Sequence, residues 1–282
     1  MKRKGRILAK GLIFPEGPRW HEGAFWFSDM HAKTVCRIDS KGQRSVVVDV
    51  PGSPSGLGWL PDGRMLVVSM QDQLLLRHEQ DGSLVEVADL SKWTTHLCND
   101  MVVDPTGRAY VGNFGFDLHA GDPIRTTNLI RVDPNGDVQQ VADGLAFPNG
   151  AVITPDGRTL IVGETFGARL AAFDIRPDGS LENHRLWASV PGVAPDGICL
   201  DAEGAVWVAS PIGAEVVRVR EGGEIVDRIP VETQAFACML GGETGRTLFV
   251  CTARGSDPED CKKEQAGRIE TFEVSVPRAG LP

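Results

Sequence analysis

The sequence predicts an all-β fold, a six-bladed β-propeller with four-stranded blades, from three observations. A pattern of a short apolar strand, a turn that ends in glycine and a second apolar strand occurs six times along the 282 residues. Most of these hairpins are followed by two more strand-like segments. No amphipathic segment of ten or more residues has the period of a helix. Four short strands in each unit of about 40–50 residues are typical of a propeller blade.

The six hairpins establish the repeat. Their sequences are PRWHEGAFWFSDM, GLGWLPDGRMLVVSM, MVVDPTGRAYVGNF, AVITPDGRTLIVGET, ICLDAEGAVWVAS and CMLGGETGRTLFVCTA. Their turn glycines are Gly23, Gly63, Gly107, Gly157, Gly204 and Gly245, which are 40, 44, 50, 47 and 41 residues apart. The high content of 33 glycines fits a chain with many tight turns.

The outer strands predict how the ring closes. Third strands are TVCRIDS, LLLRHEQ, NLIRVDP, RLAAFDI, EVVRVRE and GRIETFEV, and fourth strands are SVVVDV, LVEVADL, VQQVADG and EIVDRIP. The sixth unit ends after its third strand, while the segment RILAK (6–10) precedes the first unit without a partner. We therefore expect this N-terminal segment to be the outermost strand of the sixth blade, which removes two exposed sheet edges. The prediction is one propeller domain over residues 1–282.

Composition narrows the range of partners. The formal net charge of −9 disfavours nucleic-acid binding, since an acidic surface repels phosphates. No apolar stretch has the length of a signal peptide or of a transmembrane helix, and no basic amphipathic segment suggests membrane attachment. None of the six cysteines belongs to a C-x-x-C pair, so we expect buried, reduced thiols. These features predict a cytoplasmic protein with a small-molecule substrate, and they leave its oligomeric state open.

Aligning the repeats on their turn glycines brings polar residues to one position. Eight residues before the glycine stand Ser55, Asn99, Asn149 and Asp196 in units two to five, and Ala237 in unit six. In unit one Glu16 stands seven residues before it. This position begins the innermost strand, at the mouth of the central channel. The repeat therefore predicts that the polar members of this set converge on the propeller axis.

Glu16, Asn99, Asn149 and Asp196 supply two carboxylates and two amides. Such hard oxygen donors suit Ca²⁺, Mg²⁺ or Mn²⁺ better than zinc or copper. We predict one divalent cation, with Ca²⁺ the first choice and Mg²⁺, Mn²⁺ or Zn²⁺ as alternatives. Asn149-Gly150 and Asp196-Gly197 could instead be ordinary turn dipeptides. Four polar residues at one repeat position favour the metal site.

These motifs resemble the family of calcium-dependent propellers that includes gluconolactonase, regucalcin and senescence marker protein. The resemblance covers nearly the whole chain and rests on FPEGPRW, SGLGWLPDGR, CNDMVVDPTGRAYVGNFG, FPNGAVITPDGRTLIVGET and PDGICLDAEGAVWVA. It implies that Glu16, Asn149 and Asp196 bind the metal, and that Asn99 binds the metal or the substrate. It also implies hydrolysis of a lactone or related ester, with Asp196 as general base and Asn99 as the second catalytic residue.

One departure from the family concerns the substrate. Members that act on sugar lactones carry an arginine two residues before the equivalent of Asn99, whereas this chain has Leu97. We therefore expect a less polar lactone or ester. Candidate substrate contacts are Leu97, Met101, Phe114, His119, Arg125 and Phe166. The long segment 116–128 is expected to cover the channel mouth.

Several alternatives stay open from the sequence. The chain could be a sugar-lactone hydrolase, a phosphotriesterase or a calcium-binding protein without turnover. His96 or His119 could act as an acid or base. No G-x-S-x-G motif indicates a serine hydrolase.

Overall fold

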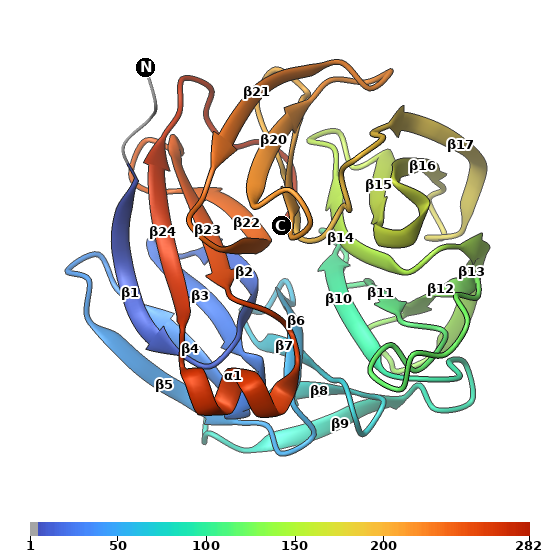
Figure 1. Cartoon of the computed structure of the whole chain (residues 1–282). Coiled ribbons are helices and arrows are strands. Elements are labelled where there is room, and N and C mark those ends of the chain that lie inside the picture. The colour runs from blue at the N-terminus through green and yellow to red at the C-terminus, as the bar shows by residue number, and fades with distance from the viewer. Residues whose placement is uncertain (1–4) are drawn as a thin grey trace.

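Six four-stranded antiparallel sheets form a closed ring, as the sequence predicts (Figure 1). The computed structural model describes residues 5–282, so the first four residues of the predicted domain lie outside this range. Blade 1 contains β2 (Pro15–His21), β3 (Ala24–Asp29), β4 (Thr34–Ile38) and β5 (Arg44–Asp49). Blade 2 contains β6 (Pro54–Trp59), β7 (Met65–Ser69), β8 (Leu74–His78) and β9 (Leu84–Asp89). Blade 3 contains β10 (Cys98–Val103), β11 (Ala109–Asn113), β12 (Thr127–Val132) and β13 (Val138–Leu145).

The other three blades complete the ring. Blade 4 contains β14 (Pro148–Ile153), β15 (Thr159–Glu164), β16 (Arg169–Ile175) and β17 (Leu181–Ser189). Blade 5 contains β18 (Ile198–Leu200), β19 (Val206–Ser210), β20 (Glu215–Val219) and β21 (Ile225–Pro230). Blade 6 contains β22 (Gln234–Gly241), β23 (Thr247–Ala253), β24 (Gly267–Glu273) and, from the other end of the chain, β1 (Arg6–Leu12).

The N-terminal strand closes the ring as predicted. Strand β1 pairs antiparallel with β24, with Leu12 opposite Gly267 and Arg6 opposite Thr271. Its last residue, Leu12, is fully buried in the core between the first, fifth and sixth blades. The strand therefore supplies the fourth strand of blade 6 and part of the apolar core that joins the two ends of the chain.

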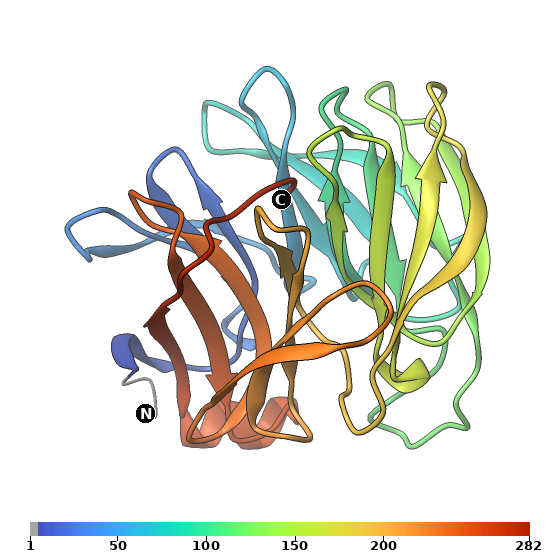
Figure 2. The same cartoon turned by 90° about the horizontal axis from the view of Figure 1, so that it is seen from above.

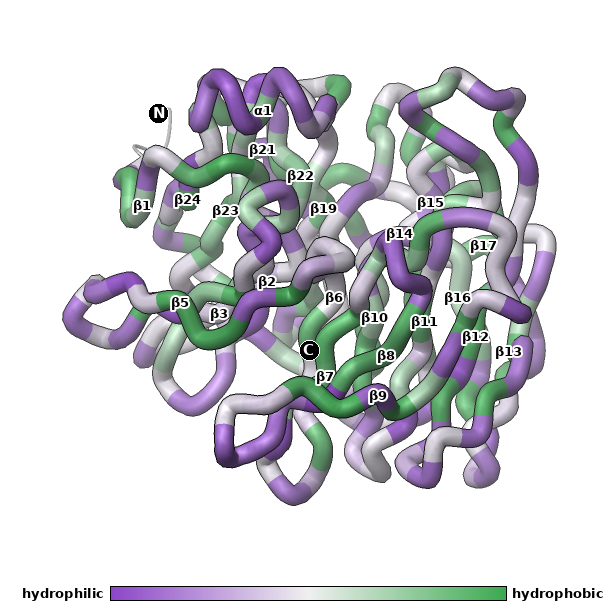
Figure 3. The backbone as a smooth tube through the Cα atoms, turned by 90° about the horizontal axis from the view of Figure 1, so that it is seen from below, coloured by the Kyte–Doolittle hydropathy of each residue, from purple (hydrophilic) through white to green (hydrophobic). Residues whose placement is uncertain are grey.

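The six turn glycines lie where the repeat places them. Each connects the first and second strands of its blade and has a positive φ, from 69° at Gly245 to 90° at Gly107. A side chain on such a backbone is strained, which explains why glycine marks every unit. Apolar stretches follow the strands while the loop tips are hydrophilic (Figure 3).

The main helix of the described chain is short and was not predicted. Helix α1 (Pro258–Glu264) lies between β23 and β24, and the 3₁₀ turns η1 (Met30–Ala32) and η2 (Thr165–Gly167) follow β3 and β15. Asp257 caps α1 by accepting hydrogen bonds from the backbone N–H groups of Glu259 and Asp260, and proline follows at the first helical position. No helix within residues 5–282 combines the length and apolar character needed to cross a membrane. All six cysteines are buried and free, as expected.

The C-terminal segment covers the face of the ring where the innermost strands end. Beyond β24 the chain runs across blades 6, 5 and 4 toward the axis (Figures 1 and 2). Arg278 donates to the carbonyl of Trp20, and Leu281 forms an antiparallel bridge with Ile153. The C-terminal segment does not cover the opposite face, where the innermost strands begin.

Replacing Leu12 by alanine tests the closure. We expect Leu12→Ala to lower the free energy of unfolding by about 2–5 kcal/mol, because a cavity opens where the two chain ends meet. The matched control is Ile7→Ala on the same strand, where the side chain is 49% exposed and a loss of about 0.5 kcal/mol or less is expected. Urea unfolding measures both. Equal losses would show that β1 does not stabilise the ring through its buried end.

Candidate active site

One cavity of about 530 Å³ opens on the face where the innermost strands begin. Loops from all six blades line it, and its wall is largely apolar. Glu16, Asn99 and Asn149 each occupy the second position of an innermost strand, in β2, β10 and β14. Asp196 stands two residues before β18.

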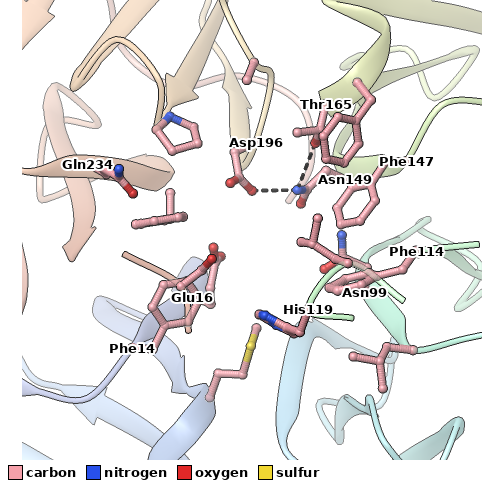
Figure 4. Close-up of a pocket in the computed structure, with 18 of the residues that line it drawn as sticks. Phe14, Glu16, Asn99, Phe114, His119, Phe147, Asn149, Thr165, Asp196 and Gln234 are labelled. Atoms are coloured by element: carbon pink, nitrogen blue, oxygen red, sulfur yellow. Dashed lines mark hydrogen bonds between the residues drawn. The ribbon is translucent and has the colours of Figure 1, made fainter. Parts of the chain in front are cut away.

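The four predicted metal-binding residues share this cavity. Figure 4 shows their polar groups directed at the same central space, with Asp196 and Glu16 from blades 5 and 1 and the two amides from blades 3 and 4. Ser55, which the repeat also places here, is buried and does not line the cavity; Ser53 lines it instead. The alignment of the six repeats therefore identified four carboxylate and amide side chains that share one cavity.

The glycines after Asn149 and Asp196 serve close packing at the axis rather than turns. A Cβ atom on Gly150 would lie 2.5 Å from the backbone nitrogen of Ile198, and one on Gly197 would lie 2.4 Å from the Cβ of Ala237. Asn149-Gly150 lies within β14, and Gly150 donates to the carbonyl of Asp196 in the next blade. The adjoining blades thus approach closely enough to bring Asn149 and Asp196 into contact.

That contact is a short hydrogen bond. Asn149 Nδ2 donates to Asp196 Oδ1 at 2.6 Å and lies 3.3 Å from Thr165 Oγ1. Glu16 Oε2 accepts from the backbone N–H of Gly17 at 2.9 Å. Asn99 has a weaker contact, 3.5 Å from its Nδ2 to the carbonyl of Pro148.

The two carboxylates strongly disfavour being charged together. The pKa of Glu16 is raised from its ordinary 4.5 to about 8, chiefly by burial; the Gly17 hydrogen bond opposes this rise and the nearby charge of Asp100 adds to it. Burial also raises the pKa of Asp196 well above its usual range, and the charge of Glu16 adds to this effect. A positive charge between them would relieve both the desolvation and the repulsion.

The donor set fits a hard divalent cation. Glu16 and Asp196 provide two negative charges, and Asn99 and Asn149 provide neutral amide oxygens once their side chains turn the oxygen inward. Among residues 5–282, no group of three or more His, Cys, Asp or Glu side chains is arranged to hold a metal. The present set differs from such groups because amides make up half of it.

Below these residues, Arg19 joins three blades through four hydrogen bonds. From β2 it donates to the carbonyl of Leu57 in β6 at 2.8 Å and to that of Met101 in β10 at 2.6 Å. Its guanidinium also contacts Asp100 Oδ1 at 2.5 Å and the carbonyl of Pro18 at 2.8 Å. Arg19 is 3% exposed. It therefore fixes the strands that carry Glu16 and Asn99 relative to each other.

Of the predicted substrate contacts, Leu97, Phe114, His119 and Phe166 line the cavity. Phe114 packs on Phe147 with 4.3 Å between ring centroids, and Phe166 meets the same ring edge-on at 5.2 Å. The segment 116–128 places Leu118 and His119 at the mouth, beside Leu97. His96 does not line the cavity; its Nε2 lies 3.4 Å from Asp117 Oδ2.

The structure places Met101 and Arg125 elsewhere, which corrects the sequence interpretation. Met101 stands two residues further along β10 than Asn99 and is fully buried in the core between blades 2 and 3. Arg125 is exposed on the outer part of the 116–128 segment and is absent from the cavity wall. Met101 lies too far along its strand to reach the cavity. Arg125 lies on a part of its loop that runs away from the cavity.

Sequence reasoning identified only Phe114 of a second ring of residues. The residue directly after the second strand lines the cavity in five blades: Met30, Met70, Phe114, Thr165 and Pro211. The same repeat alignment that found the axial residues could have found this ring. It was overlooked because its members differ in polarity from blade to blade.

The buried residues that end the second strands also escaped notice. Asp29 accepts from the backbone N–H of Phe14 at 2.8 Å, and Glu164 accepts from that of Ala146 at 2.8 Å. Ser210 Oγ accepts from the N–H of Ala194 at 3.2 Å. Each bond holds the loop that leads into an axial residue.

Comparison with known proteins agrees with this architecture. Residues 14–254 match the family described as SMP-30/Gluconolactonase/LRE-like region. The chain belongs to this family. It is 29% identical to human regucalcin over 276 residues, which cover 93% of this chain and 91% of regucalcin. It is 27% identical to a pentonolactonase of Haloferax volcanii over 291 residues, covering 98% and 96% of the two chains.

A solved structure supports the fold. The crystal structure of a calcium-binding regucalcin from Agrobacterium tumefaciens superposes with a TM-score of 0.84 at 22% identity, covering 100% of this chain and 97% of the other. The predicted family and propeller fold are therefore confirmed.

Removing the guanidinium of Arg19 tests its role as the link between blades. Arg19→Met should lower the free energy of unfolding by about 3–5 kcal/mol, because Asp100 is left buried without its partner. Adding Asp100→Asn to this variant removes the unpaired charge and should restore part of the loss. Urea unfolding at neutral pH measures the series. Wild-type stability in Arg19→Met would show that the pair does not hold the strands together.

The raised pKa of Glu16 predicts how stability depends on pH without a divalent cation. Because its folded pKa of about 8 exceeds its ordinary 4.5, Glu16 stabilises the fold fully below about pH 4.5 and progressively less as pH rises to 8. Burial lowers the pKa of His21 and His31, which act in the opposite direction near pH 6.5. The difference between wild type and Glu16→Gln reports the Glu16 carboxylate together with its effect on the pKa of Asp196.

We expect Glu16→Gln to gain stability relative to wild type as pH rises from 5 to 8 in a chelator. Each pKa unit of difference corresponds to about 1.4 kcal/mol. Urea midpoints at several pH values provide the measurement. A constant difference across this range would contradict a raised pKa.

Proposed function

We propose that this protein is a metal-dependent hydrolase that opens a lactone or related ester. The observation that supports it most is the convergence of two carboxylates and two amides in a largely apolar cavity of about 530 Å³. Family relatives include a pentonolactonase, a regucalcin and a 6-deoxy-6-sulfogluconolactonase of Pseudomonas putida. The six buried, free thiols are compatible with a cytoplasmic location, which we also propose.

We propose Glu16, Asn149, Asp196 and Asn99 as the residues that hold the cation, with Ca²⁺ as the first candidate. When bound, a divalent cation supplies Lewis-acid polarisation of the lactone carbonyl and stabilises the charge that develops on its oxygen. The remaining chemistry belongs to side chains of this chain.

Asp196 is the proposed general base. Its carboxylate accepts a proton from the attacking water as the new C–O bond forms. The ring C–O bond then breaks, and the same proton passes to the departing alkoxide, which leaves a hydroxy acid. Asn149 adjoins Asp196, since a 2.6 Å hydrogen bond joins the two side chains in this structure. Asn99 orients the substrate, since its amide lines the cavity and has only one long contact with the protein.

The cavity wall favours a substrate less polar than a sugar lactone. Phe14, Phe114, Phe147 and Phe236 surround the space together with Leu97. Among the described residues that line it, none is lysine or arginine. A polyhydroxylated ring would lose hydrogen bonds to water here without gaining the charge-assisted bonds that a lysine or arginine donates.

Lactone hydrolysis with and without a chelator tests the proposed function. Purified protein with Ca²⁺, Mg²⁺ or Mn²⁺ should hydrolyse simple lactones, and Asp196→Asn should lower kcat at least about a hundredfold, as expected when a general base is removed. Asp117→Asn is the matched control, because this carboxylate is half-buried against His96 and lies outside the cavity wall. Cation binding without any turnover would favour a calcium-binding protein, and turnover of organophosphates alone would favour a phosphotriesterase.

Leu97→Arg tests the polarity of the substrate. Wild-type protein should show a higher kcat/KM for alkyl or aryl lactones than for gluconolactone. An arginine at 97 can make charge-assisted hydrogen bonds, each worth about 1.5–3 kcal/mol, so it should narrow this gap by tenfold or more. The measurement is kcat/KM for alkyl lactones, aryl lactones and gluconolactone, taken with the same metal in wild type and in Leu97→Arg. A wild-type preference for gluconolactone would overturn the proposal.

A further inference from the structure

The side chains around the cavity mouth differ in polarity from one side to the other, as a comparison of equivalent loops shows. In four blades, the residue two positions before a left-handed backbone residue lines the mouth. These residues are His31 before Lys33 (φ 62°), Gln71 before Gln73 (φ 55°), Phe166 before Ala168 (φ 46°) and Ile212 before Ala214 (φ 47°). The same loop geometry thus carries polar side chains on blades 1 and 2 and apolar side chains on blades 4 and 5.

The other two blades extend the polar side. Blade 3 contributes His119 from the 116–128 segment, and blade 6 contributes Ser256 before α1. His31 Nε2 lies 3.2 Å from the carbonyl of Ser256, so these loops are joined by a polar contact. Over blade 3 the apolar Leu118 stands beside His119, whereas over blades 4 and 5 Phe166 and Ile212 make the outer rim hydrophobic.

Between that rim and Asp196, most of the residues of blades 4 and 5 that line the cavity are apolar. We call these apolar residues the blade 4–5 strip, which consists of Phe166, Ala168, Val193, Ala194, Pro211 and Ile212. None of these side chains carries a hydrogen-bonding group. Ala194 stands two residues before Asp196, so the inner end of the strip adjoins the proposed general base.

The strip is a formed surface rather than a loose loop. Val190 donates to the carbonyl of Ala168 at 2.9 Å, and Val193 donates to that of Val190 at 3.0 Å. Across the strip, Val231 donates to the carbonyl of Ala214 at 2.9 Å. Despite this support, Ile212 is 69% exposed and Phe166 is 40% exposed. Two large apolar side chains are thus held in solvent at the end of a path from the cavity.

We propose that the blade 4–5 strip binds an unbranched alkyl chain attached to the lactone ring. The ring lies among Glu16, Asn99, Asn149 and Asp196, and the chain leaves the cavity between Phe166 and Ile212. This inference rests on the proposed function and adds the substrate class and its orientation. His31, Gln71, His119 and Ser256 on the rim of blades 1, 2, 3 and 6 make an exit there less favourable for the chain.

The test is a series of lactones whose alkyl substituent lengthens one methylene at a time. A fully buried methylene gains about fourfold in affinity, so a strip that covers one side of the chain should give about twofold in kcat/KM for each methylene. Ile212→Glu should abolish most of this increase while the unsubstituted lactone reacts as in wild type. Because Ile212 is largely exposed, the variant is expected to fold.

Ile124→Glu is the matched control. Ile124 is 59% exposed on the 116–128 segment but does not line the cavity, so this variant should keep the wild-type dependence on chain length. A wild-type rate that does not rise with chain length would overturn the proposal, and so would an unchanged dependence in Ile212→Glu.

Binding of alkyl-substituted lactams separates this inference from the proposed function, because a lactam resists hydrolysis. Calorimetry should show affinity that rises with chain length in wild type and not in Ile212→Glu. If lactam affinity rises in this way but no lactone is hydrolysed, the proposed alkyl-chain site is supported and the proposed function is contradicted. If lactones are hydrolysed but lactam affinity does not change with chain length, only the proposed alkyl-chain site is contradicted.

Discussion

The repulsion between two carboxylates at the propeller axis is the constraint on which the site depends. Glu16 and Asp196 come from blades 1 and 5 and face a common space in the cavity. Both have raised pKa values because burial opposes their charge. An arrangement of this kind is costly for the fold alone, and it becomes favourable when a cation neutralises the charges. This cost is the strongest physical reason to propose a divalent metal here.

The ring supports this arrangement at three levels. Glycines at 150 and 197 let neighbouring innermost strands approach until Asn149 bonds to Asp196. Arg19 ties the strands of blades 1, 2 and 3 together beneath the cavity. Residues at the ends of the second strands, such as Asp29, hold the loops that carry the axial side chains. Loops at the rim are free to differ, so they can set substrate preference while the axial residues stay fixed.

The sequence was sufficient for the architecture because a propeller repeats one local pattern. Turn glycines gave the number of blades, and an unpaired N-terminal segment gave the closure. Rotational equivalence then placed Glu16, Asn99, Asn149 and Asp196 in one cavity. Proximity to Asn99 in the sequence was a poor guide for Met101, since two residues along a strand change the depth of a side chain. The prediction for Arg125 failed because the path of a long loop depends on tertiary contacts.

Interactions across blades were the least accessible to sequence reasoning. Arg19 stands three residues after Glu16 in a strand, and nothing local indicates that its partners are Asp100 and two carbonyls of other blades. Similarly, the apolar character of Phe166 and Ile212 gains meaning only beside the polar residues at equivalent loops. Such features require the folded ring.

Proton release on cation binding tests the central claim most directly. At pH 7 a Glu16 with a pKa of about 8 is mostly protonated in the cation-free protein, so a cation bound by this carboxylate must displace its proton. Calorimetric titration of the metal-free protein with Ca²⁺, repeated in buffers of different ionisation enthalpy, counts the protons. Because the pKa values of Glu16 and Asp196 are both raised, the account predicts one site whose occupation releases protons, with a smaller release in Glu16→Gln. Binding without proton release, or the same release in Glu16→Gln, would contradict it.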